Sequence, residues 1–529
     1  MKANLEKALS QWKEAVGQEY VRDDEAMLDR YSWCNIPKSV RASAILFPAD
    51  VDEVQKVVRI AAVCEVPLYP ISQGKNWGYG AACPVQEDNV ILDLRRLNKI
   101  HEVNEKLAYA VVEPGVTQQQ LYNYLKEHQI PLEFDVTGAS PEASLLGNIL
   151  ERGYGQTPYS DHFLNSCSME VVLADGRILE TGFGHYPNAK TRYLYKWGIG
   201  PYLDGIFSQS NFGIVTKIGI WLLPKPPHFG VFFFDIPDDR WLGETVERLR
   251  ELKLQGVLTS AVHLFNDIRV ISSLQQYPWK ETYGKTPLPE EVRKDIQRKH
   301  RVKAWNCAGG LRGTRKQIRA NLDRIRKSLR GLVRVHYLSD TMIYWLERFE
   351  QPLKKISGLD VRRRVSFLNL LRGIPTENPQ LACYWRKRKK APEDHYTPLK
   401  DRCGLIWCSP MIPMTGEDVL AFLQMTRSIC TQYGFETNVS MNLVTERALD
   451  CVVAISYDKE DPHETLKASE CHREILKSYL EAGYIPYRID TQSMNVILQD
   501  DPFWQVCREI KRTLDPHHIF SPGHYNFPP

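Results

Sequence analysis

The segment from Ser72 to Gly80 has the composition of a loop that binds phosphate. It follows the strand-like run 66–71 and carries glycines at positions 74, 78 and 80. Glycine lets the backbone approach a ligand closely, so that successive N–H groups can donate to phosphate oxygens. The loop is neither a Rossmann fingerprint, because Cys83 stands where the third glycine belongs, nor a P-loop, because Asn76 follows Lys75. Taken alone, such a loop is more often an ordinary turn.

A second glycine-dense segment, residues 147–161, supplies the partner that such a loop needs. It is too long for a tight turn, and two loops of this kind can hold an extended dinucleotide between them. The residues that we expect to bind the cofactor are Ser72, Gln73, Gly74, Lys75, Asn76, Gly78 and Gly80 in the first loop and Gly147, Asn148, Glu151, Arg152, Gly153, Gly155 and Thr157 in the second.

Residues 70–226 resemble the FAD-binding domain of the vanillyl-alcohol oxidase and p-cresol methylhydroxylase family. The matching pieces are Asn76-x-Gly-Tyr-Gly80, Val112-Glu-Pro-Gly-Val-Thr117, Gly147-Asn148, Glu151-Arg152-Gly153, Thr157-Pro-Tyr-x-Asp161, Gly200-Pro-Tyr-x-Asp-Gly205 and the run 207–217, which contains Ile214. Their order and number make chance similarity improbable. A resemblance with fewer matching residues continues through the second lobe to Pro522-Gly523. The resemblance implies FAD as the cofactor, with Ile214 among the residues that bind it.

The resemblance also implies a phenol-binding site at Tyr79, Tyr487 and Arg488. In that family two tyrosines and one arginine hold a para-substituted phenol as its phenolate. A phenol has a pKa of about 10, so it must be ionised before its ring can release a hydride from the benzylic carbon. A guanidinium and two hydroxyl donors favour that anion. The implied reaction is hydride transfer to the flavin, giving a quinone methide that water or an internal nucleophile traps.

Other family positions have changed. Leu405 stands where the oxidase carries its flavin-linked histidine, so no histidyl bond is expected there. The tyrosine that has this role in the methylhydroxylase falls nearest to Thr397 and Tyr396. Tyr396 and its neighbour His395 are therefore the candidates for a covalent link, although non-covalent FAD is the favoured interpretation.

The family's active-site carboxylates are also altered. Thr137 or Gly138 replaces the aspartate near flavin N5, and Met441 corresponds to the glutamate that faces the benzylic carbon. Glu393 matches an acidic position by spacing and is the remaining candidate for the catalytic base. The alternative for Glu393 is a solvated glutamate in a charged loop.

The elements around these residues predict an α+β fold with two lobes, a PCMH-type FAD-binding domain and a mixed α/β substrate (cap) domain. Asp50 and Thr117 are placed to begin helices, runs 66–71, 90–94 and 108–112 predict strands, and Asp175-Gly176 predicts a hairpin turn. The proline-rich run 224–227 is the best linker. We expect the FAD-binding domain in 1–225, with 491–529 returning to it, and the substrate domain in 228–490.

The composition limits the kinds of molecule that the protein is expected to bind. The 529 residues carry 68 Lys and Arg against 64 Asp and Glu, a formal net charge of +4 that does not suggest nucleic acid. No apolar run approaches the roughly 20 residues of a membrane span, and the 12 cysteines lack the spacing of a metal site, which predicts a cytoplasmic enzyme without metal. The expected partners are a small aromatic substrate, molecular oxygen or an electron-transfer protein as acceptor, and further copies in a homo-oligomer.

Two alternatives to phenol oxidation stay open. The lost carboxylates favour an oxidase of a non-phenolic alcohol or a biosynthetic tailoring oxidation. The basic run 386–390 is expected to form a solvated surface loop, but a patch of this kind could also dock an acidic electron carrier. It is the one feature that favours a catalytically weak flavin-binding protein acting through surface contacts.

Overall fold

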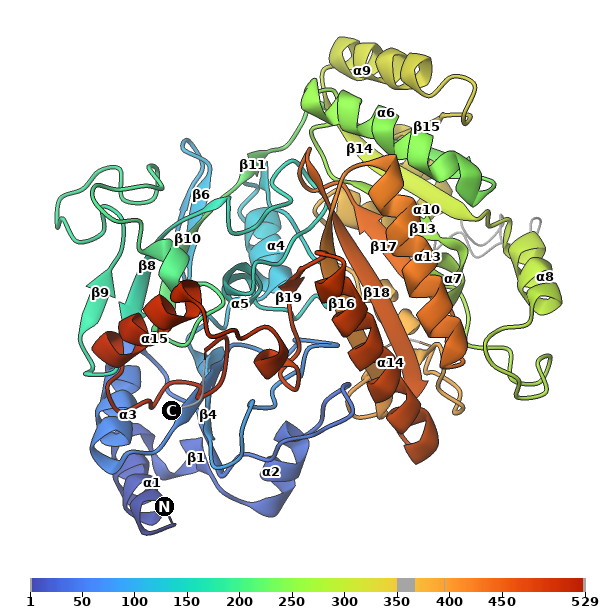
Figure 1. Ribbon diagram of the computed structural model, residues 1–529. Helices are drawn as coiled ribbons and strands as arrows, with labels where there is room; N and C mark the ends of the chain where they lie inside the picture. Colours follow the sequence, from blue (N-terminus) through green and yellow to red (C-terminus); the bar gives the residue numbers. More distant parts are fainter. Residues whose placement is uncertain (1, 350–366, 394, 527–529) are drawn as a thin grey trace.

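The computed structural model describes residues 2–349, 367–393 and 395–526, and it places them in two lobes (Figure 1). The first lobe contains a four-stranded sheet in the order β1-β2-β4-β3 and a five-stranded sheet in the order β5-β6-β10-β8-β9. Its strands are β1 (Val21–Arg22), β2 (Ala44–Leu46), β3 (Leu68–Ile71), β4 (Val90–Asp93), β5 (Ile100–Asn104), β6 (Tyr109–Val112), β7 (Leu132–Glu133), β8 (Ser166–Val172), β9 (Ile178–Glu180), β10 (Ile214–Trp221) and β11 (Leu223–Pro224). Its helices are α1 (Lys2–Val16), α2 (Glu25–Tyr31), α3 (Val51–Cys64), α4 (Gln118–Glu127) and α5 (Leu145–Leu150).

Side-chain caps begin helices α2, α3, α4 and α5 of this lobe. Asp50 accepts a hydrogen bond from the Glu53 backbone at the start of α3, and Thr117 accepts one from Gln120 at the start of α4. Each cap satisfies a backbone donor that the helix itself cannot pair. Both helix starts predicted from the sequence are therefore confirmed, as is the hairpin of β8 and β9.

The second lobe is built on an eight-stranded antiparallel sheet in the order β15-β12-β14-β13-β17-β18-β16-β19. Its strands are β12 (His228–Ile236), β13 (Val262–Asn266), β14 (Trp305–Gly313), β15 (His336–Ser339), β16 (Cys403–Pro413), β17 (Val439–Asn442), β18 (Ala448–Asp458) and β19 (Pro486–Arg488). Its helices are α6 (Leu242–Leu254), α7 (Asp267–Ser272), α8 (Glu290–His300), α9 (Arg315–Ser328), α10 (Asp340–Arg348), α13 (Gly416–Gln432) and α14 (Pro462–Glu481), and a 3-10 helix, η5, covers Asn378–Tyr384.

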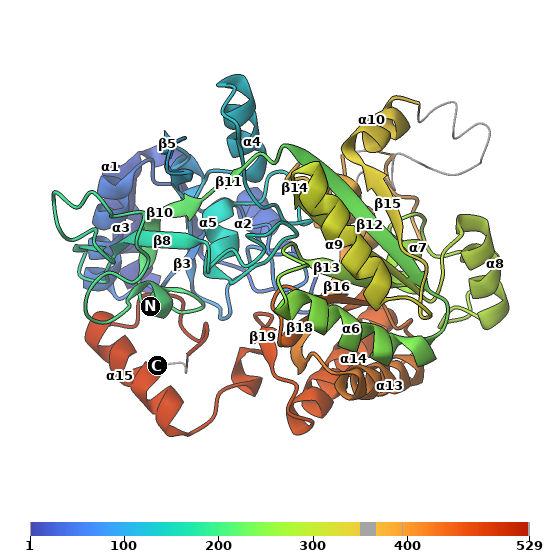
Figure 2. The same cartoon turned by 90° about the horizontal axis from the view of Figure 1, so that it is seen from above.

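Helices α6, α9, α13 and α14 cover one face of the large sheet (Figures 1 and 2). Successive residues of a strand point to opposite faces. Cys408, Met441 and Cys451 belong to the hydrophobic core beneath the helices, so their neighbours Ser409, Asn442 and Asp450 point to the other face. The α+β fold predicted from the sequence is confirmed.

The C-terminal segment packs on the first lobe. After β19 the chain forms α15 (Pro502–Leu514), which lies beside the five-stranded sheet (Figure 1). Backbone hydrogen bonds join Leu68 to Ile519 at 2.7 Å and Ser521 to Leu68 at 2.8 Å, so the end of the chain adds to the edge of β3. Among the helices in the described part of the chain, none is both long and apolar enough to cross a bilayer.

Candidate active site

The loop after β3 requires glycine at position 80. Gly80 has a φ of +124°, and a Cβ there would collide with the side chain of Thr491. The backbone N–H of Thr491 donates to the carbonyl oxygen of Tyr79 at 3.0 Å. The absence of a side chain at Gly80 thus allows the C-terminal segment to fix the position of Tyr79.

The same loop offers unused hydrogen-bond donors. The backbone N–H groups of residues 73–76 donate to no acceptor among the described residues, although the loop is only partly exposed. Successive free N–H groups in a glycine-containing loop form a concave anion site. The donor set therefore fits the diphosphate of a dinucleotide such as FAD.

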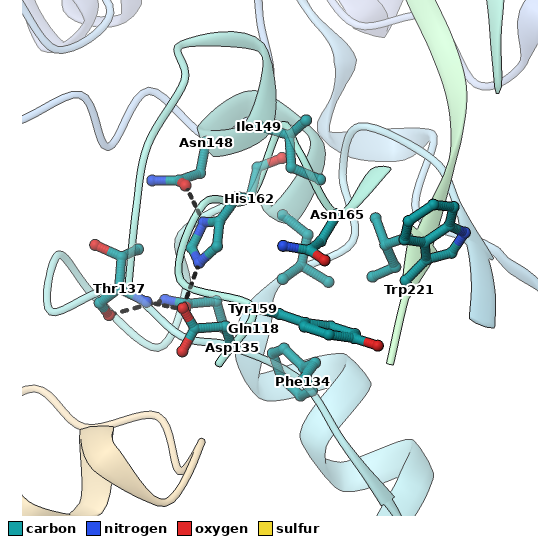
Figure 3. A pocket seen from close by; sticks show the side chains of 13 residues that line it. Gln118, Phe134, Asp135, Thr137, Asn148, Ile149, Tyr159, His162, Asn165 and Trp221 are labelled. Carbon is teal, nitrogen blue, oxygen red and sulfur yellow. Dashed lines mark hydrogen bonds and ion pairs between the residues drawn. The ribbon is translucent and has the colours of Figure 1, made fainter. Parts of the chain in front are cut away.

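The second loop is held by an internal network around Asp135. Asp135 Oδ1 accepts from the backbone N–H of Gln156 at 3.0 Å and of Thr157 at 2.9 Å, and His162 Nε2 lies 3.0 Å from Asp135 Oδ2. The other ring nitrogen of His162 bonds to Asn148 Oδ1 (Figure 3). Because these N–H groups already have protein partners, we expect the donors for phosphate to come mainly from the first loop.

Glycine is required in the second loop as well. A Cβ at Gly153 would collide with Asn148, and a Cβ at Gly155 with Asp135. The hollow drawn in Figure 3 is lined by Thr137 and Asn148, among other residues of the first lobe, and not by the predicted phenol-binding side chains.

The fold brings Tyr79, Tyr487 and Arg488 together. Strand β19 carries Tyr487 and Arg488 to the edge of β16, where Arg488 pairs in register with Ser409. The Arg488 guanidinium carbon lies 4.5 Å from the centre of the Tyr79 ring, and Arg488 donates to Asn76 Oδ1 at 2.6 Å. The Tyr79 hydroxyl bonds to Ser409 Oγ at 2.6 Å, and Tyr79 is only 2% exposed. We call Tyr79, Tyr487 and Arg488 the tyrosine–arginine cluster.

Electrostatics keep this cluster in its hydrogen-bond-donating form. Burial raises the pKa values of Tyr79 and Tyr487, so both remain protonated at neutral pH. Burial opposes the charge on Arg488, but Glu151, at 3.2 Å from Arg488 Nε, and the neighbouring tyrosines raise its pKa above the ordinary value. Glu151, predicted among the cofactor residues, thus lies against Arg488. The cluster presents one permanent cation and two neutral hydroxyls, a combination that stabilises an oxyanion.

Sequence reasoning missed a buried carboxyl group beside this cluster. Asp450 in β18 is 5% exposed, and its Oδ1 has no hydrogen-bond partner among the described residues. Burial raises the pKa of Asp450 well above its ordinary value. A negative charge on Asp450 would in turn raise the pKa values of Tyr79, Tyr154 and Tyr487. The signal for this residue was an acidic side chain between the apolar residues Leu449 and Cys451 of strand 448–458. Perturbed carboxyl groups in such surroundings are candidates for proton transfer.

A polar chain also runs behind Tyr154, whose ring lies 6.0 Å from that of Tyr487. Asn442 donates to the Tyr154 hydroxyl at 2.7 Å, and its amide oxygen bonds to His263 Nδ1. Burial lowers the pKa of His263 to about 4, so this ring is neutral. Met441, which corresponds by spacing to the glutamate of the methylhydroxylase, lies in the helix-side core, and its neighbour Asn442 points to the other face of the sheet.

The structure does not bring Glu393 to the cluster. The Glu393 side chain is 91% exposed and lies 4.0 Å from Lys390, so its prediction as the catalytic base is corrected. His395 is 86% exposed, whereas Tyr396 packs against Tyr384 with ring centres 5.7 Å apart. Leu405 is 3% exposed and lacks a nucleophilic atom.

The expected solvated loop at 386–390 is wrong for its first two residues. Arg386 and Lys387 are each 2% exposed. Arg386 pairs with Glu436 at 3.0 Å and also with Glu464, and Lys387 pairs with Asp458 at 2.8 Å. These residues neutralise buried carboxylates inside the second lobe, which leaves little of the run to dock a partner.

The chain is similar to a known family and to known proteins. A family model described as an FAD binding domain matches residues 42–182. The chain is 38% identical to 1'-carboxy-chondrochloren decarboxylase from Chondromyces crocatus, over 99% of this chain and 97% of the relative. It is 32% identical to the 4-cresol dehydrogenase (hydroxylating) flavoprotein subunit from Pseudomonas putida, over 98% of this chain and 94% of the relative.

Two solved structures are similar over the whole chain. Substrate-bound p-cresol methylhydroxylase superposes with a TM-score of 0.89 and 30% identity, covering 100% of this chain and 98% of the other. The isoeugenol complex of 4-ethylphenol oxidase from Gulosibacter chungangensis superposes with a TM-score of 0.91 and 28% identity, with the same coverage.

Proposed function

The chain belongs to the vanillyl-alcohol oxidase and p-cresol methylhydroxylase family of FAD-dependent oxidoreductases, and on that premise we propose that it oxidises a para-substituted phenol at its benzylic carbon. The observation that carries the proposal is the convergence of Tyr79, Tyr487 and Arg488. Bound FAD supplies the hydride acceptor. A 4-alkylphenol or a 4-hydroxybenzyl alcohol would be a suitable substrate.

The tyrosine–arginine cluster binds the substrate oxygen in this proposal. Arg488 provides a fixed positive charge, and the Tyr79 and Tyr487 hydroxyls donate hydrogen bonds, so the bound phenol loses its proton at a lower pH than the free phenol. Asn76 orients the guanidinium through the 2.6 Å hydrogen bond. The negative charge on the substrate oxygen then assists release of the benzylic hydride and formation of a quinone methide.

Asp450 takes the base role first predicted for Glu393. It is buried beside the tyrosines, and burial raises its pKa, so its carboxylate form is a stronger base than that of an exposed aspartate. In the ionised form, its function would be to accept a proton from the water that adds to the quinone methide, which would leave Asp450 as the carboxylic acid.

The first lobe, which we assign to residues 1–225 together with 491–529, binds FAD. The N–H groups of residues 73–76 would hold the diphosphate, and Asn148 and Thr137 line a hollow in the same lobe. We propose non-covalent FAD, because Leu405 cannot form a bond and the tether candidate Tyr396 packs against protein. The substrate lobe is then 228–490, and either oxygen or an electron-transfer protein serves as the final acceptor.

A decarboxylating oxidation is a second candidate, favoured by the 38% identity to a protein named as a decarboxylase. Hydride loss from the benzylic carbon would leave a quinone methide. If the adjacent carbon carried a carboxylate, the C–COO⁻ bond would break, CO₂ would leave, and the electron pair would form a C=C bond as the ring regained its phenolate. This route needs no added water and therefore no base.

Anaerobic flavin reduction distinguishes these functions. We would mix the FAD-loaded enzyme with 4-alkylphenols, 4-hydroxybenzyl alcohols and the corresponding O-methyl ethers, and record flavin absorbance. The proposal predicts bleaching by the phenols and none by the ethers, which cannot ionise. Equal bleaching by ethers would instead favour an oxidase of non-phenolic alcohols, and no bleaching by any compound would favour a catalytically weak flavoprotein. Release of CO₂ from carboxylated substrates would identify the second candidate.

A further inference from the structure

Arg269, on helix α7, is a deeply placed cation without a counter-charge. Its guanidinium makes no ion pair or hydrogen bond with the described residues. Other arginines in comparable surroundings do have one: Arg293 pairs with Asp267, Arg312 with Glu133, Arg386 with Glu436 and Arg488 with Glu151. Burying a charge without a partner costs free energy, so a buried arginine of this kind is expected where a bound ligand supplies the opposite charge.

Arg269 lies near the tyrosine–arginine cluster. Helix α7 packs against η5, which carries Cys383, and the charge of Arg269 interacts with Cys383 and with Tyr154, whose ring lies 6.0 Å from that of Tyr487. Cys383 shares a hydrophobic cluster with Leu405 and with partly buried Trp407, whose ring lies 5.5 Å from that of Tyr79. Arg269 therefore borders the same site, separated from Tyr487 by Tyr154.

The Arg269 side chain is partly accessible although the residue lies deep in the second lobe. Burial is the main influence on Arg269 and lowers its pKa, yet its side chain is only half-buried by surface area. Because Arg269 is far from bulk solvent and still partly accessible, there is room for a small ligand group beside its guanidinium. The planar guanidinium fork matches a carboxylate, with two parallel N–H···O bonds.

We infer that Arg269 binds a carboxylate on the para side chain of the substrate, so that the substrate class is the 4-hydroxyphenyl alkanoates. This inference rests on the proposed function, because the phenolate oxygen is assumed to lie on Tyr79, Tyr487 and Arg488. A carboxylate is preferred to a phosphate because Arg269 contributes a single positive charge. The inference concerns recognition, and it holds whether the carboxylate is retained or lost in the reaction.

The test compares acids with their primary amides, which have nearly the same shape but no charge. The FAD-loaded enzyme would be titrated with 4-hydroxyphenylacetate, 3-(4-hydroxyphenyl)propanoate and 4-(4-hydroxyphenyl)butanoate, and with the three amides, under anaerobic conditions. For at least one chain length the acid should bind more tightly than its amide. In Arg269→Met the ratio of the two Kd values should shift against the acid by about 10- to 100-fold, as expected for loss of a charge-assisted hydrogen bond.

Two variants separate recognition from a merely structural effect. Arg269→Lys retains the charge and should recover part of the acid preference. Arg388→Gln removes a positive charge from a side chain that is 53% exposed and should leave the ratio unchanged. An acid-to-amide ratio that Arg269→Met does not move would overturn the inference, even if phenols reduce the flavin.

Failure of the proposed function would look different. 3-Phenylpropanoate has the carboxylate but no phenol, and calorimetric titration of the FAD-loaded enzyme reports its binding without chemistry. If no phenol reduces the flavin and 3-phenylpropanoate still binds in an Arg269-dependent manner, the carboxylate site stands and the phenol assignment fails. If 3-phenylpropanoate and the phenolic acids all bind equally well to the parent and to Arg269→Met, Arg269 is not a carboxylate site.

Discussion

Replacing Arg488 by methionine should shift the pH dependence of flavin reduction upward. Arg488 is 10% exposed and contacts Tyr79, Asn76 and Glu151, so its charge is weakly screened by solvent. A charge-assisted hydrogen bond contributes roughly 1.5–3 kcal/mol, and a pKa shift of one unit corresponds to about 1.36 kcal/mol. The cation lowers the pKa of the bound phenol, so its removal should raise that pKa by about one to two units.

Stopped-flow measurement of anaerobic flavin reduction across pH would show this shift. At neutral pH the variant should be about 10- to 100-fold slower than the parent, with the difference disappearing at high pH, where solvent ionises the phenol. Arg488→Lys keeps the charge but not the planar fork, and should lie between the two. A pH profile of Arg488→Met that superposes on that of the parent would refute a phenolate-stabilising role.

Removal of Arg488 also leaves the Glu151 carboxylate without its arginine partner, although the Tyr525 hydroxyl still donates to it at 3.2 Å, and a double variant isolates that effect. If part of the loss comes from the unpaired Glu151, the double variant Glu151→Gln/Arg488→Met should be faster than Arg488→Met alone. The upward shift of the pH profile should persist in the double variant, because the cation is still absent. A profile restored to that of the parent would assign the whole effect to Glu151.

Three further predictions concern the buried acid, the cofactor loop and the flavin bond. Asp450→Asn should stabilise the protein more at about pH 8 than at about pH 5 in thermal melts, because a carboxyl group whose pKa is raised in the folded state destabilises the fold as it ionises with rising pH; an equal effect at both pH values would contradict a raised pKa of Asp450. Gly80→Ala should lower stability by about 1–3 kcal/mol in urea unfolding and reduce FAD content, because its Cβ collides with Thr491. Gly284→Ala, at a φ of +72° but in open space, should cost less, and equal costs would contradict the packing argument. Acid precipitation should release the flavin, because Leu405 offers no bonding atom; a coloured pellet would show a covalent link elsewhere.

Local sequence signals predicted the elements of the first lobe well. Asp50 and Thr117 cap the helices that they were expected to cap, and Asp175-Gly176 forms the predicted hairpin turn. Such signals act within a few residues, so the sequence contains all the information that they need. The strands of the large sheet were less visible, because β16, β17 and β18 are mostly buried on both faces and lack a simple alternation.

The candidate site could be predicted only where the family resemblance located it. No local pattern relates Tyr79 to Arg488, since their contact depends on the pairing of β19 with β16. Glu393 was misplaced because linear spacing through a loop does not determine which residue reaches the site. The burial of Arg386 could not be foreseen either, because its partner Glu436 is supplied by a distant part of the chain.

Asp450 and Arg269 illustrate what composition alone cannot show. Each is a charged residue directly flanked by apolar residues, and in sequence neither differs from a residue that pairs with a distant partner. Their unpaired atoms become informative only when the surrounding side chains are known. Both lie near Tyr154, another residue that the sequence did not single out.

The isotope effect on flavin reduction tests the central claim most directly. We would compare 4-ethylphenol deuterated at the benzylic carbon with 4-ethylphenol deuterated at the terminal methyl group, each mixed anaerobically with the FAD-loaded enzyme. The account predicts that benzylic deuteration slows flavin reduction severalfold, whereas methyl deuteration leaves the rate nearly unchanged. Equal rates for the two compounds, or no reduction by either, would contradict benzylic hydride transfer from a phenolate bound at Tyr79, Tyr487 and Arg488.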